Sequence, residues 1–166
     1  REVVPHTRDW DRAEQVDRGI VAKLAEVGFL GMTVPEEYGG SGGDHLSYCL
    51  MMEELGRGDS AIRGIVSVSL GLVGKTILSF GTEEQKQRWL TRLCAGDSLA
   101  CFGLTEPDTG SDAGNLATKA VRDGDGWTIS GSKMFITNGT WADLALVFAR
   151  TGEAGPRGVT AFLVPT

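Results

Sequence analysis

The sequence predicts an α+β protein, with a helical domain over residues 1–97 followed by a partial antiparallel β-domain over residues 98–166. Before Gly96, apolar residues recur at helical spacing in several segments, whereas after it short β-prone runs alternate with Gly and Asp turns. Helices and strands thus occupy separate blocks, which favours α+β or two distinct domains over a parallel βαβ sheet.

Two helices and a loop are predicted in the first sixty residues. Residues 11–27 form the first predicted helix, because Val16, Ile20, Val21, Leu24 and Val27 lie on one helical face. Residues 35–43 contain four glycines and a proline and are expected to form a loop. A second helix is predicted from Asp44 to about residue 55.

Two more helices are predicted before Gly96, where the sequence changes from helical spacing to short β-prone runs. Residues 59–80 are apolar on nearly all sides and carry regularly placed small residues, which predicts a buried, closely packed helix. Thr82 and Gln85 have the spacing of a capping box, so the last helix should begin there and continue to about residue 93. Gly96 is placed to end it.

Six strands are predicted after Gly96, over residues 99–104, 117–121, 127–129, 133–137, 144–149 and 159–164. Residues 123–126 read Asp-Gly-Asp-Gly and predict a tight hairpin turn. The sequence stops directly after the last of these strands, which suggests a fragment of a longer chain.

Composition and charge narrow the function classes. The 41% hydrophobic and 23% charged residues are typical of a globular protein, and no segment approaches about 20 uninterrupted apolar residues, so no membrane span is expected. A net charge of −6 argues against a nucleic-acid surface. Cys49, Cys94 and Cys101 lack metal-ligand spacing and are interpreted as reduced structural residues of a cytoplasmic protein, although a removed targeting segment is compatible with an initial Arg.

Other catalytic motifs are missing from the sequence. It contains no Gly-x-Gly-x-x-Gly, no Walker loop and no Gly-x-Ser-x-Gly. His6 and His45 have no partner at a recognisable ligand or triad spacing, so no metal site is predicted.

Two motifs carry the functional signal. Residues 101–112 read CFGLTEPDTGSD, and residues 133–139 read KMFITNG. In this order and at this separation they resemble the FAD-binding signature of the acyl-CoA dehydrogenases. Residues 38–40 (YGG) and 80–86 (FGTEEQK) extend the resemblance over nearly the whole chain.

The resemblance implies an FAD site built from both motifs. It places the backbone of Leu104 and the hydroxyl of Thr105 at the pyrimidine edge of the flavin, and the hydroxyl of Thr137 at N5. It also implies that Phe135 packs on the ring system, and that Gly110 and Ser111 approach the pyrophosphate. Ser111 further matches a substrate-contacting position. The complete set of implied cofactor residues is Phe102, Leu104, Thr105, Gly110, Ser111, Phe135, Ile136 and Thr137.

The implied reaction is oxidation of an acyl-CoA thioester to the trans-2-enoyl thioester, with loss of the α proton to a base and of the β hydrogen as hydride to flavin N5. In the family the base is a glutamate of a further helical domain, expected beyond Thr166, so no catalytic residue is assigned in this chain. Glu53, Glu54, Glu83 and Glu84 are interpreted as solvated helix faces. The resemblance also implies a homotetramer and an electron-transfer flavoprotein as electron acceptor.

Arg63 has two interpretations. Its segment is similar to that of glutaryl-CoA dehydrogenases, which implies that Arg63 contacts the distal carboxylate of a diacid thioester. Alternatively, Arg63 is a helix-start residue that pairs with Asp59 or with solvent.

Two other functions remain open on the sequence. The same fold serves an acyl-CoA oxidase or a dehydrogenase acting on carrier-protein thioesters. A non-catalytic flavin-binding partner subunit is the alternative from another class, because no base lies within the chain.

Overall fold

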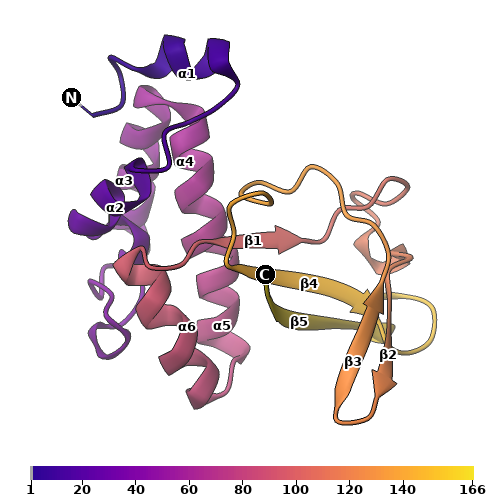
Figure 1. Ribbon diagram of the computed structural model, residues 1–166. Coiled ribbons are helices and arrows are strands. Elements are labelled where there is room, and N and C mark those ends of the chain that lie inside the picture. Colours follow the sequence, from indigo (N-terminus) through magenta and orange to yellow (C-terminus); the bar gives the residue numbers. More distant parts are fainter. Residues whose placement is uncertain (1) are drawn as a thin grey trace. The chain divides into compact units, whose positions relative to one another are not determined.

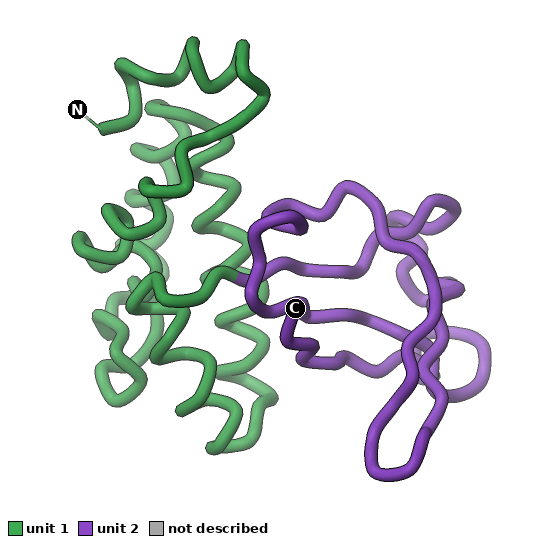
Figure 2. Tube along the Cα trace, in the orientation of Figure 1, with its two compact units in different colours: residues 1–99 green, residues 100–166 purple. Residues whose placement is uncertain are grey.

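The computed structural model describes residues 2–166 and confirms the α+β class (Figure 1). The chain divides into two compact units, residues 1–99 and residues 100–166, called here the helical unit and the sheet unit (Figure 2). All α-helices of the described chain lie in the first, and all its strands lie in the second.

The N-terminal region differs from the prediction of one helix over residues 11–27. Two short helices form instead, α1 (Thr7–Ala13) and α2 (Ile20–Glu26). Glu14 ends α1 in a left-handed conformation with φ of 51°. Asp17 accepts a hydrogen bond from the amide of Gly19 at 2.9 Å, a local turn that competes with helix formation. The apolar spacing was therefore correct only for the face that α2 buries.

The predicted loop is confirmed over residues 35–43, where only the 3₁₀ turn η2 (Glu36–Tyr38) is regular. A Cβ on Gly40 would lie 2.0 Å from the carbonyl oxygen of Val34, so this close approach requires glycine. The hydroxyl of Tyr38 donates to the Glu83 carboxylate at 3.0 Å, which anchors the loop on α6. Burial and this carboxylate together raise the pKa of Tyr38 to about 12.

The two central helices are confirmed. Helix α3 (His45–Gly58) begins after Asp44, whose carboxylate accepts from the amide of Ser47 at 2.7 Å. Asp59 caps the next helix in the same way. That helix runs without interruption through α4 (Ser60–Val66), the π-helical segment η3 (Ser67–Gly74) and α5 (Lys75–Phe80); the π-helical stretch was not foreseen.

By length and composition, the helix Ser60–Phe80 is also apolar enough to cross a membrane, which corrects the expectation that no segment comes near this limit. In the structure, 44% of the most apolar stretch of this helix is buried. The core helix of a globular protein can have the same length and apolar composition. Arg63 and Lys75 interrupt the apolar run.

Helix α6 (Glu83–Ala95) has the predicted capping box. The hydroxyl of Thr82 accepts from the amide of Gln85 at 3.2 Å, and the Gln85 side chain accepts from the amide of Thr82 at 2.9 Å. Gly96 ends the helix with φ of 76°. The buried face of α6 contributes Trp89, Leu90 and Leu93 to the core of the helical unit.

The sheet unit contains β1 (Ala100–Gly103), β2 (Lys119–Asp123), β3 (Gly126–Ser130), β4 (Leu144–Arg150) and β5 (Val159–Pro165). The sheet is mixed rather than antiparallel as predicted, because β4 pairs in parallel with β1 and antiparallel with β5. Its order is β1-β4-β2-β3, with β5 on β4. The predicted hairpin is confirmed, since Asp123 pairs with Gly126 in the antiparallel β2–β3 register.

The predicted strand over residues 133–137 does not form. Phe135 and Asn138 adopt left-handed conformations, with φ of 57° and 67°, which is incompatible with an extended strand. The apolar residues of this stretch are not paired in the sheet, and the Phe135 side chain is exposed. The segment is an irregular connection between β3 and β4.

Candidate functional site

The first motif leaves the sheet at the end of β1 and turns sharply. The amide of Glu106 donates to the carbonyl oxygen of Thr109 at 2.9 Å, and the amide of Thr109 donates back to Glu106 at 3.3 Å. Pro107 and Asp108 form the exposed tip between them. Glu106 and Pro107 therefore shape a turn.

The Glu106 carboxylate is buried at the centre of this region, with 5% of the residue exposed. It accepts hydrogen bonds from the amides of Ala117 at 2.6 Å and Thr118 at 2.9 Å, and from Lys133 Nζ at 2.8 Å. Burial alone would favour the protonated form, but the donors, Lys133 foremost, outweigh it and lower the Glu106 pKa to about 2. Glu106 is therefore ionised at neutral pH.

The second motif is fastened to the end of β1. Lys133 Nζ donates to the carbonyl oxygen of Leu104 at 3.1 Å, and the amide of Met134 donates to the carbonyl oxygen of Thr105 at 3.0 Å. Farther along, Asn138 Nδ2 donates to the carbonyl oxygen of Ala100 at 3.0 Å. Two segments that are almost 30 residues apart in the sequence therefore lie side by side.

Between these anchors, the second motif presents residues to solvent. Phe135 is 86% exposed in its left-handed conformation, Thr137 is exposed and Ile136 is half-buried. On the first motif, Leu104 and Thr105 are half-buried, and the ring of Phe102 packs on Phe148 with centroids 5.0 Å apart. Phe102 is thus partly committed to packing within the sheet unit.

Gly110 and Ser111 lie on the exposed loop after the turn. The following residues are held by Arg150, whose guanidinium donates to the carbonyl oxygens of Gly114 at 2.8 Å and Leu116 at 3.1 Å. The same side chain donates to Glu153 and Gly155 at 2.7 and 3.1 Å. Arg150 therefore connects the loop after Ser111 to the turn that precedes β5.

These residues fit a flavin. A Cβ on Gly110 would meet no atom within 4 Å and its φ is not left-handed, so the chain itself does not require glycine there and the backbone is open to a ligand. The exposed Phe135 ring offers an apolar face. Within residues 2–166, the hydroxyls of Thr105, Ser111 and Thr137 have no hydrogen-bond partner and are available to a ligand.

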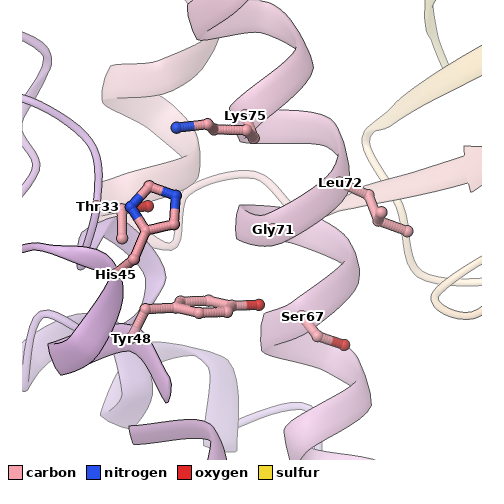
Figure 3. Close-up of a pocket in the computed structure, with 7 residues that line it drawn as sticks. All are labelled: Thr33, His45, Tyr48, Ser67, Gly71, Leu72 and Lys75. Atoms are coloured by element: carbon pink, nitrogen blue, oxygen red, sulfur yellow. The ribbon is translucent and has the colours of Figure 1, made fainter. Parts of the chain in front are cut away.

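The helical unit has a separate cavity of about 330 Å³ against the π-helical segment (Figure 3). Tyr48 of α3 reaches across it toward Gly71, where a Cβ would lie 2.5 Å from the Tyr48 hydroxyl oxygen. Glycine therefore keeps the two helices this close. The lining comprises Thr33, His45, Tyr48, Ser67, Gly71, Leu72 and Lys75.

Arg63 of α4 forms no ion pair with Asp59 among the described residues, and the Asp59 carboxylate caps the helix. The only hydrogen bond of its side chain in the described residues is a long one, 3.5 Å, to the Ser60 hydroxyl. Burial raises the pKa of Tyr48, and the positive charge of Arg63 opposes this rise. Of the structural interpretation of Arg63, pairing with Asp59 does not occur in the described residues, whereas contact with solvent is compatible with its partly exposed side chain.

Several site residues escaped the sequence interpretation. Lys133 and Asn138 stand inside the second motif, but their partners on β1 are too distant in sequence to be inferred. Arg150 had a weak signal, because a charged residue directly follows the apolar run 144–149. None of the three was assigned a role.

Comparison with known proteins places both units in one family. The sequence model of the acyl-CoA dehydrogenase N-terminal domain matches residues 1–97, and that of the middle domain matches residues 101–166. The mitochondrial short-chain specific acyl-CoA dehydrogenase of Bos taurus is 43% identical over 166 residues, covering 99% of this chain and 40% of that protein.

Solved structures agree. A structure described as the electron transferring flavoprotein of Acidaminococcus fermentans contains a chain that superposes with a TM-score of 0.96 at 42% identity, covering 100% of this chain and 44% of that one. A glutaryl-CoA dehydrogenase of Mycobacterium smegmatis, solved with FADH2, gives 0.91 at 42% identity, covering 98% and 41%. This chain thus spans about two fifths of the length of these relatives, and it belongs to the acyl-CoA dehydrogenase family.

Proposed function

We propose that the complete protein is an FAD-dependent dehydrogenase that oxidises an acyl-CoA thioester to the trans-2-enoyl thioester. The observation that carries this proposal is the junction of the two motifs in the sheet unit, which presents an exposed aromatic ring and free hydroxyls on adjoining segments. When bound there, FAD supplies the acceptor for the hydride that leaves the β-carbon.

Each residue of the junction is proposed to contact a different part of the cofactor. The hydroxyl of Thr105 would serve the pyrimidine edge of the flavin and that of Thr137 would serve N5, while the Phe135 ring would pack on the flat face. Ser111 donates its hydroxyl to the pyrophosphate or to substrate, and Gly110 allows the backbone to approach closely. Leu104 contributes backbone, because Lys133 already engages its carbonyl oxygen and fixes it in place.

No base for the α proton is assigned among residues 1–166. Glu106, the buried carboxylate of the junction, is occupied by three donors and has a pKa of about 2, so it is unsuited to accept a proton from carbon. Glu53 and Glu54 are engaged on the surface by Arg57. We propose that the base comes from the part of the family's chain that these residues do not span.

We propose a short acyl chain for the substrate, supported by the short-chain name of the bovine relative. A diacid such as glutaryl is the second candidate, favoured by an Arg63 guanidinium that no carboxylate neutralises in the described chain. Electron-transfer flavoprotein is the proposed acceptor of the electrons. Oxygen as acceptor would make the protein an oxidase instead.

The first prediction concerns reduction of bound flavin. The protein expressed from its complete gene is expected to purify with oxidised flavin, whose visible absorption bleaches anaerobically when butyryl-CoA or glutaryl-CoA is added. The proposal fails if no flavin binds. Bound flavin that no acyl-CoA reduces would instead favour a carrier-protein substrate or the non-catalytic interpretation.

The second prediction concerns Arg63→Ala. If Arg63 binds the distal carboxylate of a diacid substrate, the replacement removes one charged hydrogen-bonding pair. The kcat/KM for glutaryl-CoA should then fall about tenfold or more, while the kcat/KM for butyryl-CoA changes little. Arg57→Ala is the matched control, since Arg57 is an exposed arginine of α3 whose ion pairs within residues 2–166 are those with Glu53 and Glu54. Equal effects on both substrates would exclude the carboxylate-reading role.

A further inference from the structure

The ion pair of Lys133 and Glu106 lies between the two motifs rather than within either. Its Nζ–Oε1 distance is 2.8 Å, and the two side chains are only 13% and 4% exposed. The same ammonium donates to the carbonyl oxygen of Leu104 at 3.1 Å. One side chain of the second motif therefore contacts both a backbone oxygen and a carboxylate of the first.

Glu106 extends the connection to a third segment. Its two carboxylate oxygens accept from the consecutive amides of Ala117 and Thr118, just before β2. The carboxylate thus joins the turn after β1, the start of β2 and the segment that follows β3. All of its donors lie in the sheet unit.

The segment that Lys133 secures contains backbone strain. Two residues later, Phe135 has a φ of 57°, a conformation that an aromatic residue adopts only at a cost. Such a conformation persists when the surroundings determine it more than once. Here the determinants are Lys133 and Met134 on one side, bonded to Leu104 and Thr105, and Asn138 on the other, bonded to Ala100.

Stability alone is a poor explanation for this ion pair. Removing two charges from water is costly, and an apolar pair of similar volume often stabilises a protein as well. What an apolar pair cannot provide is direction, because a charged donor fixes the carbonyl oxygen of Leu104 and the carboxylate of Glu106 in one geometry.

We propose that Lys133 and Glu106 are positioning residues, whose ion pair sets the distance between the flavin-binding backbone at Leu104–Thr105 and the flavin-binding side chains at Phe135–Thr137. This inference rests on the proposed flavin function. Neither residue touches the cofactor in this arrangement. Both act through the backbone segments that they join.

The test uses the holoenzyme from the complete gene and compares Lys133→Met, Lys133→Arg and wild type. Lys133→Met is expected to weaken FAD binding about tenfold or more and to slow flavin reduction by the acyl-CoA up to about 100-fold, since small displacements of reacting groups have effects of this size. Lys133→Arg keeps a charged donor and is expected to recover most of both. The visible spectrum of the bound flavin should shift in Lys133→Met alone.

Phe162→Ala is the control for a purely structural effect. Phe162 is half-buried in β5 and packs on Trp127 of β3 with ring centroids 5.4 Å apart, so its truncation destabilises the same sheet without removing a contact of the two motifs. At a temperature where all variants are folded by circular dichroism, Phe162→Ala should bind FAD as wild type does.

The outcomes separate the two proposals. If wild type binds no flavin, the proposed function fails and this inference with it. If wild type binds and reduces flavin but Lys133→Met does so equally well, only the positioning role is overturned. Parallel losses in Lys133→Met and Phe162→Ala would likewise overturn it, because the pair would then act through stability alone. Should Lys133→Met not fold, Lys133→Gln and Glu106→Gln at reduced temperature provide the same comparison.

Discussion

Acidification is expected to destabilise the sheet unit through Glu106 as the pH falls from about 4.5 to about 2. The pKa of this carboxyl is about 2 in the folded protein, against 4.5 for an unperturbed glutamate. The unfolded chain therefore takes up the proton first, and the folded state loses its advantage as the pH drops. The contribution of Glu106 is complete above pH 4.5 and is lost progressively down to pH 2.

The carboxylate itself should account for much of this acid sensitivity. Glu106→Gln removes one member of a buried ion pair and is expected to lower the free energy of unfolding by about 3 kcal/mol at neutral pH. The variant should then lose less further stability on acidification than wild type does. Urea denaturation at about pH 7 and about pH 3, followed by circular dichroism, measures both quantities.

Glu54→Gln is the matched control for the acid experiment. Glu54 is an exposed carboxylate of α3 that forms a surface ion pair with Arg57, and such pairs contribute about 1 kcal/mol or less. Its pH dependence should follow that of wild type. An unchanged acid slope in Glu106→Gln would show that the buried pair is not the source of the sensitivity.

The features that the sequence predicted correctly are set by neighbours in the chain. The capping box at Thr82 and Gln85, and the hairpin at residues 123–126, each involve residues only three apart, so the residue types suffice to predict them. The buried helix over residues 59–80 was likewise predicted from its local pattern. Its π-helical stretch, Ser67–Gly74, was not predicted, and the close approach of Tyr48 to Gly71 in that stretch is not a local contact either.

The structural features that were predicted wrongly from the sequence depend on residues distant in the chain or on function. The parallel pairing of β1 with β4 joins segments about 40 residues apart, and no local pattern encodes it. Residues 133–137 look like a strand because Phe135 and Ile136 are apolar. The Phe135 side chain is nevertheless directed to solvent, which is consistent with a binding role rather than a core role.

The same distinction applies to the candidate site. The two sequence motifs identified the candidate cofactor-binding residues. The structure brings Leu104 and Thr105 of the first motif beside the second motif. The buried ion pair that connects them could not be inferred, because a Glu and a Lys in separate motifs have no recognisable spacing. The roles of the exposed hydroxyls remain predictions.

Replacing Arg150 by methionine is expected to lower the free energy of unfolding by about 3 kcal/mol. The guanidinium donates to the carbonyl oxygens of Gly114, Leu116, Glu153 and Gly155, and hydrogen bonds from a charged donor are the stronger class. No carboxylate takes part in these bonds. Methionine preserves the apolar stem but leaves two loops without their common donor.

Lysine should not restore the stability lost in Arg150→Met. The acceptors are distributed around a planar group: Nη1 serves the turn before β5, while Nη2 and Nε serve the loop before β2. An ammonium is a compact donor and cannot reach both loops at once. We expect Arg150→Lys to recover less than half of the lost stability in chemical denaturation of the complete protein. Full recovery would mean that charge alone matters.

Arg157→Met is the control for Arg150→Met. Arg157 is exposed in the same turn region, so its replacement should change the free energy of unfolding by less than about 0.5 kcal/mol.

The loop that Arg150 holds directly follows Gly110 and Ser111, which we assign to the cofactor. In Arg150→Met that loop loses its fixed end while the junction at Lys133 is retained. Weaker FAD binding with an unchanged flavin spectrum would therefore separate the anchoring of the pyrophosphate from the positioning of the ring.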